Sequence, residues 1–109
     1  EYQRETTVLR LPPGGKFPPK SYSTMNTYQP GFGKNDADLY WLCAWEHQYL
    51  TGTGAQRTAA AQQISTITSK YVYLHSYNAY TRQQTDQQLA AMHHGDPRPI
   101  QHDFQLNCT

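Results

Sequence analysis

The segment Asn35–Thr51 restricts the fold of this chain most strongly, because it holds both tryptophans, one of the two cysteines and the densest run of large apolar side chains. These side chains recur at steps of three and four along two adjoining ridges, which is the spacing on one side of an α-helix. The ridges consist of Leu39, Leu42, Cys43 and Leu50, and of Trp41, Trp45 and Tyr49. Such a helix must be covered on most sides, so we expect the rest of the chain to pack around it.

A second helix is predicted to start near Gly54 and to run to Tyr71, or as far as His75. Its apolar residues follow one stripe at steps of four and three, as expected for a helix with a single buried face. The stripe consists of Ala60, Ile64, Ile67, Tyr71 and Leu74. Residues 71–74 suit a strand equally well, so the pattern leaves the end of this helix open.

A third helix is predicted from about Arg82 to His94. Gly95 is placed to cap its C-terminus in a left-handed conformation, and Pro97 and Pro99 prevent the helix from continuing. The starts of the three helices are predicted from side chains that can cap free backbone N–H groups. These are Asn35, the pair Thr53 and Gln56, and the pair Thr81 and Gln84.

The predicted fold class is mainly α: a small three-helix domain, residues 35–95, with an N-terminal extended arm and a C-terminal tail. The arm, residues 1–34, is rich in proline and glycine and lacks a helical period. A short strand is expected at Thr6–Leu11, because this stretch begins with β-branched residues. The arm and the tail, residues 96–109, are both expected to pack back onto the helices.

Cys43 and Cys108 are the two cysteines, and we expect them to form a disulfide that ties the tail to the central helix. A bridge across so long a loop restricts the unfolded chain strongly. Paired cysteines in a chain low in lysine are typical of an extracytoplasmic or secreted protein. The alternative is two unrelated thiols, with Cys43 buried as a small apolar side chain.

The composition excludes several classes of protein. Aromatic residues make up 13% of the chain and its formal net charge is +1, which favours a folded body over a disordered one. No clustered basic segment is present, so a nucleic-acid partner is not expected. No apolar run approaches the roughly 18 residues that cross a bilayer, and the glycine pairs around Phe32 and Thr53 lack a phosphate-loop frame. We therefore predict no transmembrane segment in this chain and no cofactor.

Glu46 and His47 are the candidate catalytic residues. Burial beside the tryptophans can raise the pKa of Glu46 and make it a general acid, so the alternative function is a small secreted hydrolase with this acid/base pair. Cys43 and His47 are four residues apart and could ligate a metal together with His93 or His94. The spacing matches no established metal motif, and a disulfide would consume Cys43, so no metal site is predicted.

The nine tyrosines suggest the preferred function. Tyrosine covers apolar surface while keeping a polar tip, which suits recognition of another protein. We expect a non-enzymatic binding or assembly module that engages another protein, or a second copy of itself, through a tyrosine-rich surface. The alternative role for these rings is packing within the domain. The candidate binding residues are Tyr71, Tyr73, Tyr77, Tyr80, Tyr22 and Tyr28.

Overall fold

The computed structural model describes residues 2–18 and 32–108. These residues are mainly helical and contain no strand. The helices are α1 (Tyr2–Thr6), α2 (Phe32–Thr51), α3 (Ala55–Ser65), a 3₁₀ turn η1 (Thr66–Ser69), a π turn η2 (Val72–Ser76), α4 (Ala79–His93) and α5 (Arg98–Asn107). Within these ranges, no helix is both long and apolar enough to span a membrane.

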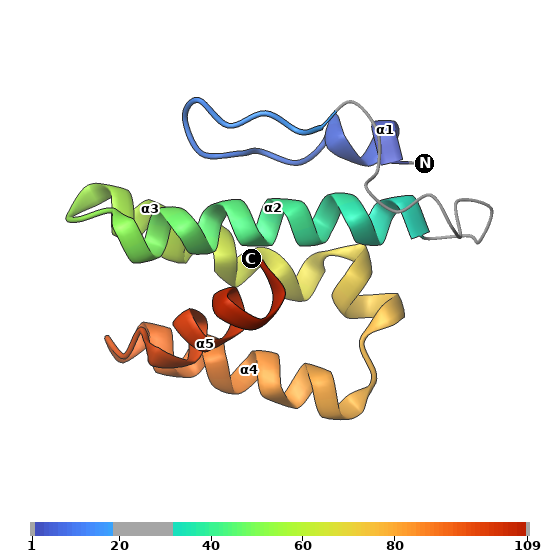
Figure 1. Ribbon diagram of the computed structural model, residues 1–109. Helices are drawn as coiled ribbons and strands as arrows, with labels where there is room; N and C mark the ends of the chain where they lie inside the picture. The colour runs from blue at the N-terminus through green and yellow to red at the C-terminus, as the bar shows by residue number, and fades with distance from the viewer. Residues whose placement is uncertain (1, 19–31, 109) are drawn as a thin grey trace.

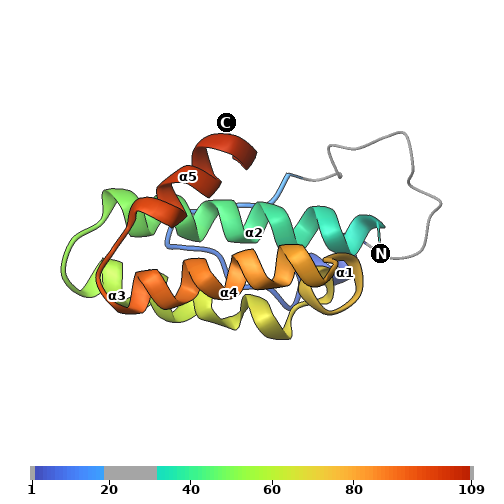
Figure 2. The same ribbon diagram turned by 90° about the horizontal axis from the view of Figure 1, so that it is seen from below.

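Helix α2 occupies the middle of the molecule (Figure 1). Helix α1 and the segment after it lie on one side of α2, and α4 and α5 lie on the other. Helix α3 packs along α2, and α4 contacts both α3 and α5. Figure 2 shows the same layers from below, with α4 in front of α2. The expectation that the chain is built around this segment agrees with this arrangement.

The two apolar ridges of α2 have different environments. Trp41, Trp45 and Tyr49 are all buried in the core. Leu39 of the other ridge is 39% exposed. The ridge that carries the tryptophans is therefore buried throughout, whereas the second ridge contributes Leu42 to the core and reaches the surface at Leu39.

The segment after α1 lies on α2 without forming a strand. Trp45 donates from Nε1 to the carbonyl oxygen of Arg10 at 2.7 Å, and the Tyr40 hydroxyl donates to the carbonyl oxygen of Lys16 at 3.0 Å. The predicted strand at Thr6–Leu11 is wrong. Its first residue ends α1, and residues 2–18 and 32–108 contain no strand with which its backbone could pair.

The predicted second helix is interrupted. Helix α3 ends at Ser65, and the 3₁₀ turn that follows closes at Lys70, whose backbone is extended. Hydroxyl groups in this stretch bond back to nearby carbonyl oxygens, as Ser65 does to Ala61 and Ser69 does to Thr66, which competes with regular helix. The chain then turns so that the Val72 amide donates to the Asp38 carboxylate at 3.0 Å.

The helix caps agree only in part with the prediction. Helix α2 begins at Phe32, before Asn35, and α3 has no side-chain cap. Helix α4 is capped by Asn78, whose Oδ1 accepts a hydrogen bond from the Thr81 amide at 2.8 Å. The three predicted side-chain caps are therefore wrong, whereas the predicted start of the second helix near Gly54 agrees with α3, which begins at Ala55. The predicted cap at Gly95 is confirmed: its φ is +84°, and the next amide, of Asp96, donates to the carbonyl oxygen of Ala91.

Replacing Asn78 with alanine should lower the free energy of unfolding by about 1 kcal/mol, because the N-terminus of α4 loses its side-chain acceptor. Gln83→Ala is the matched control, because Gln83 is an exposed residue of the same helix. Its effect should stay within about 0.5 kcal/mol. Urea unfolding followed by tryptophan fluorescence measures both. Equal effects of the two substitutions would rule out a capping role for Asn78.

The C-terminal tail is itself mostly helical. Helix α5 starts just after Pro97 and carries Pro99 in its first turn, where proline is tolerated because the first N–H groups of a helix need no partner within it. The predicted bridge is confirmed: Cys43 of α2 and Cys108 are joined by a disulfide, with their Cα atoms 5.6 Å apart. The bridge holds the end of α5 against the middle of α2.

Candidate functional site

A cleft of about 450 Å³ lies among α2, α4 and α5. Its walls are largely apolar: Leu39 and Leu42 come from α2, Leu89 from α4, and Ile100 and Leu106 from α5. Helix α4 also supplies a polar edge, which consists of Thr81, Gln84, Thr85 and Gln88. Apolar walls with a few polar groups are typical of ligand-binding pockets of this size.

Two carboxyl groups meet at the base of this cleft. Glu46 of α2 is only 1% exposed, and its side chain is hydrogen-bonded to that of Asp103 of α5. Burial and the neighbouring Asp103 carboxyl raise the pKa of Glu46 to about 10. Asn107 donates from Nδ2 to Asp103 at 2.9 Å. At neutral pH Glu46 is therefore protonated and can donate this proton to the Asp103 carboxyl.

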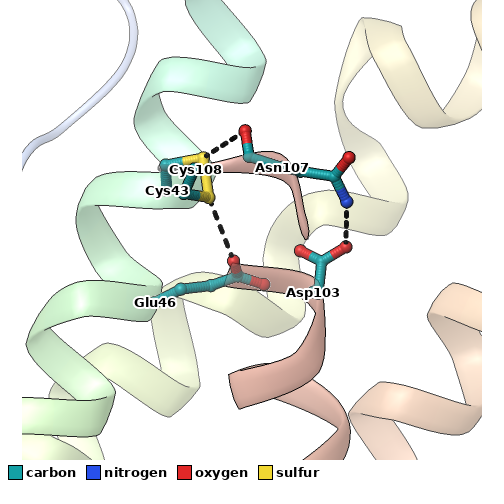
Figure 3. Close-up of a disulfide and its surroundings, with 5 residues drawn as sticks. All are labelled: Cys43, Glu46, Asp103, Asn107 and Cys108. Atoms are coloured by element: carbon teal, nitrogen blue, oxygen red, sulfur yellow. Dashed lines mark hydrogen bonds between the residues drawn. A yellow bond between two sulfur atoms is a disulfide. The ribbon is translucent and has the colours of Figure 1, made fainter. Parts of the chain in front are cut away.

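The disulfide lies against this pair, as Figure 3 shows. Sγ of Cys108 is 3.6 Å from Oε1 of Glu46. A sulfur in a disulfide carries no hydrogen and cannot donate to this oxygen. Any hydrogen bond between the two atoms requires the proton on Glu46, so this contact also favours the neutral acid.

The rim of the cleft contains exposed apolar groups. Tyr80 is 68% exposed and Leu106 is 70% exposed, and they line the cleft together with Leu39. Tyr77 is half-buried in the same lining, and burial raises its pKa to about 12. His102 adds an exposed imidazole from α5. The cleft thus joins an apolar surface to a buried acid.

The two predicted catalytic residues lie in different places. Glu46 lines the cleft, whereas His47 is exposed, does not line it, and packs against Phe104 with ring centroids 5.9 Å apart. The partner that the fold brings to Glu46 is Asp103. The sequence could have indicated that Asp103 lies near Glu46. The bridge places Cys108 beside Cys43, which is on the same helix as Glu46, and Asp103 lies five residues before Cys108.

The predicted binding tyrosines separate into groups. Tyr77 and Tyr80 line the cleft. Tyr73 packs edge-on against Tyr77 at 6.1 Å and donates from its hydroxyl to Asp86, whereas Tyr71 stacks on His75 at 4.6 Å. Tyr22 and Tyr28 lie outside the described residues. The part of the tyrosine cluster that borders a cavity is therefore the pair Tyr77 and Tyr80.

A second acidic pair lies where α1 meets α2. Asp38 is fully buried and its side chain is hydrogen-bonded to that of Glu5. Burial and this hydrogen bond raise the pKa of Asp38 to about 8. Oδ1 of Asp38 has no N–H or hydroxyl donor among the described residues, and a hydrogen bond between two carboxyl groups requires a proton on one of them. Sequence patterns gave no signal for this pair, because α1 was not predicted.

One group of metal-ligating side chains converges within the described ranges. The ligand atoms of Cys43, Glu46 and Cys108 lie within 4.8 Å of one another. The disulfide joins the two sulfurs, whereas metals bind the free thiolate, and Glu46 is protonated. The oxidised, neutral form of this group is therefore unsuited to a metal ion.

The walls of the cleft are largely apolar, and two carboxyl groups lie at its bottom. A disulfide joins α2, one of its helices, to Cys108 at the end of α5. These properties suit capture of an apolar body that carries a polar group. No protein-family model, curated protein or solved structure matches this chain.

Proposed function

We propose that this protein is a non-enzymatic binding module that takes a segment of another protein into the cleft among α2, α4 and α5. The observation that carries the proposal is the position of the exposed apolar side chains. Five large hydrophobic side chains in the described ranges are exposed, and three of them line this cleft: Leu39, Tyr80 and Leu106. Exposed apolar groups gathered around a cavity are typical of an interaction site.

The tyrosines support a protein partner. Tyr80 presents its ring at the rim, and its hydroxyl accepts a hydrogen bond from Nε2 of Gln84 at 3.0 Å. Tyr73 and Tyr77 extend the aromatic surface beside it. Aromatic side chains with polar tips are enriched in the central parts of protein interfaces, where each contributes a large contact area.

The disulfide supports an extracytoplasmic location. Disulfides persist in oxidising compartments and are rare where cellular thiols keep cysteines reduced. The bridge spans 65 residues of sequence and joins two helices that form the cleft. The shape of the binding site thus depends on a bond that an oxidising environment maintains.

Selection of peptides from a displayed library on the immobilised protein tests the proposed binding site. Leu106→Asp should weaken selected peptides at least about tenfold, because a charge replaces an apolar side chain at the rim. Val8→Asp is the matched control, because Val8 is 73% exposed and lies in the segment on the opposite side of α2. The affinities of the selected peptides for the Val8→Asp variant should stay within about twofold of their affinities for the native protein. If the selected peptides bind the Leu106→Asp variant with the same affinity as the native protein, this cleft is excluded as the binding site.

A small secreted hydrolase is the second candidate, and the paired carboxyls favour it. Glu46 holds a proton beside a second carboxyl group, and paired carboxyl groups are a common arrangement for general acid/base catalysis. In such a hydrolase, Asp103 rather than His47 is the acid/base partner of Glu46. Screening ester, glycoside and peptide substrates separates the candidates. A hydrolase requires turnover that Glu46→Gln abolishes, whereas a binding module releases its ligand unchanged.

A further inference from the structure

The ionisable groups around the cleft are unbalanced in charge. None of the described residues that line it is a lysine or an arginine. The titratable groups that line the cleft with Glu46 and Asp103 are Tyr77, which follows η2, Tyr80 of α4 and His102 of α5. The other lining residues of α4 are neutral polar or apolar, and α3 and η1 supply isoleucines. His47 of α2 is exposed and lies outside the lining. The bottom of the cleft therefore carries two carboxyl groups, and no lysine or arginine of the lining balances their charge.

Glu46 also has no N–H or hydroxyl donor among the described residues. It is 1% exposed, and its neighbours are the Asp103 carboxyl and the Cys108 sulfur. Neither neighbour has an N–H group, and the sulfur has no hydrogen. Among the described residues, only a proton shared with Asp103 satisfies the Glu46 side chain. A cationic donor that enters the cleft can replace this proton and stabilise the ionised form of Glu46.

We propose that the cleft receives an arginine side chain of the partner segment, whose guanidinium replaces the shared proton and pairs with Glu46 and Asp103. This inference rests on the proposed function, because it identifies the chemistry that the same cleft recognises. The apolar stem of the arginine lies along the leucines of the walls, and its planar head reaches the carboxyl pair. Charge complementarity thus selects the partner, while the apolar rim contributes contact area.

A guanidinium fits this pair better than other cations. It offers five N–H donors in one plane, which allows it to bridge two neighbouring carboxyl groups. It is also more weakly hydrated than an ammonium, so a partly buried site costs it less hydration. Divalent metals would need further oxygen or thiolate ligands, and the two nearby sulfurs are bonded to each other.

The test compares two tripeptides, acetyl-Leu-Arg-Leu-amide and the same peptide with citrulline, which has the shape of arginine without its charge. Isothermal titration calorimetry at pH 7.5 should give at least a tenfold higher affinity for the arginine peptide. Repeating the titration in buffers of different ionisation enthalpy should show release of up to one proton, because the guanidinium favours ionised Glu46. Affinity should therefore rise between pH 7 and pH 9, since arginine keeps its charge throughout.

Glu46→Gln should remove the proton release and most of the preference for arginine. Asp86→Asn is the matched control, because it removes one exposed negative charge of α4 that does not line the cleft. It should leave both properties unchanged. Circular dichroism of each variant separates altered binding from altered folding.

Equal affinity of the two tripeptides, or binding without proton release, would overturn the arginine site. Absence of binding by either tripeptide at millimolar concentration would overturn it as well. These outcomes differ from failure of the proposed function. That function is tested by whether Leu106→Asp lowers the affinity of library-selected peptides. A cleft that selects apolar peptides without arginine would keep the proposed function and lose only this inference.

Discussion

The double variant Cys43→Ala/Cys108→Ala should unfold with a free energy about 4 kcal/mol lower than the native protein. The bridge closes a loop with a sequence separation of 65 residues, so it restricts the unfolded chain strongly. It also joins α5 to α2 beside the buried acid pair. Without the bridge, α5 is held by its packing on α2 and α4 and by the hydrogen bond between Asp103 and Glu46.

Urea unfolding with and without reductant measures this effect, because Trp41 and Trp45 lie in the core and report loss of packing. Reduced native protein should behave like the double variant. Limited proteolysis should cut within α5 before other helices. A loss smaller than about 1 kcal/mol would mean that the packing of α5 suffices, and that the bridge has little effect on the unfolded chain.

The protein should be more stable at pH 5 than at pH 8. The pKa of Glu46 is raised to about 10 and that of Asp38 to about 8, so the folded state binds more protons than the unfolded state above pH 4 to 5. Stability therefore falls as pH rises, by up to about 1.4 kcal/mol per pH unit for each group. The decline ends near each folded pKa.

Glu46→Gln isolates one of these groups. The amide keeps the shape of the acid and can donate to Asp103 without a proton from solvent. The variant should exceed the native protein by about 2–4 kcal/mol at pH 8 and converge with it near pH 4 to 5, where Glu46 is protonated in both states. Unfolding curves at pH 5, 6.5 and 8 measure the slope. Parallel pH profiles of variant and native protein would contradict a buried neutral Glu46.

This substitution also separates stability from binding. It should stabilise the free protein at pH 8 and weaken binding of the arginine peptide. A buried acid that reduces stability while improving recognition is the trade-off expected of a functional group. A structural hydrogen bond alone would not produce opposite effects on the two measurements.

The candidate site was only half predictable from sequence. Glu46 lies on a helix whose apolar spacing indicates burial, and the cysteine pair indicates that the tail returns to this helix. Asp103 was missed because Pro97 and Pro99 were interpreted only as the end of the preceding helix. They also begin α5, since proline suits the first turn. Recognising that start would have placed Asp103 and Asn107 on one helical face.

Local spacing and backbone geometry by themselves determined the central helix, the end of α4 at Gly95 and the pairing of two cysteines. These features depend on residues a few positions apart or on a simple count. Only the tertiary structure decided that Asp38 meets Val72 after the end of α3, that Leu39 faces a cleft, and that Glu46 meets Asp103. The physical reason is distance along the chain: these contacts join residues tens of positions apart, and their burial sets the ionisation of the acids on which the proposed function depends.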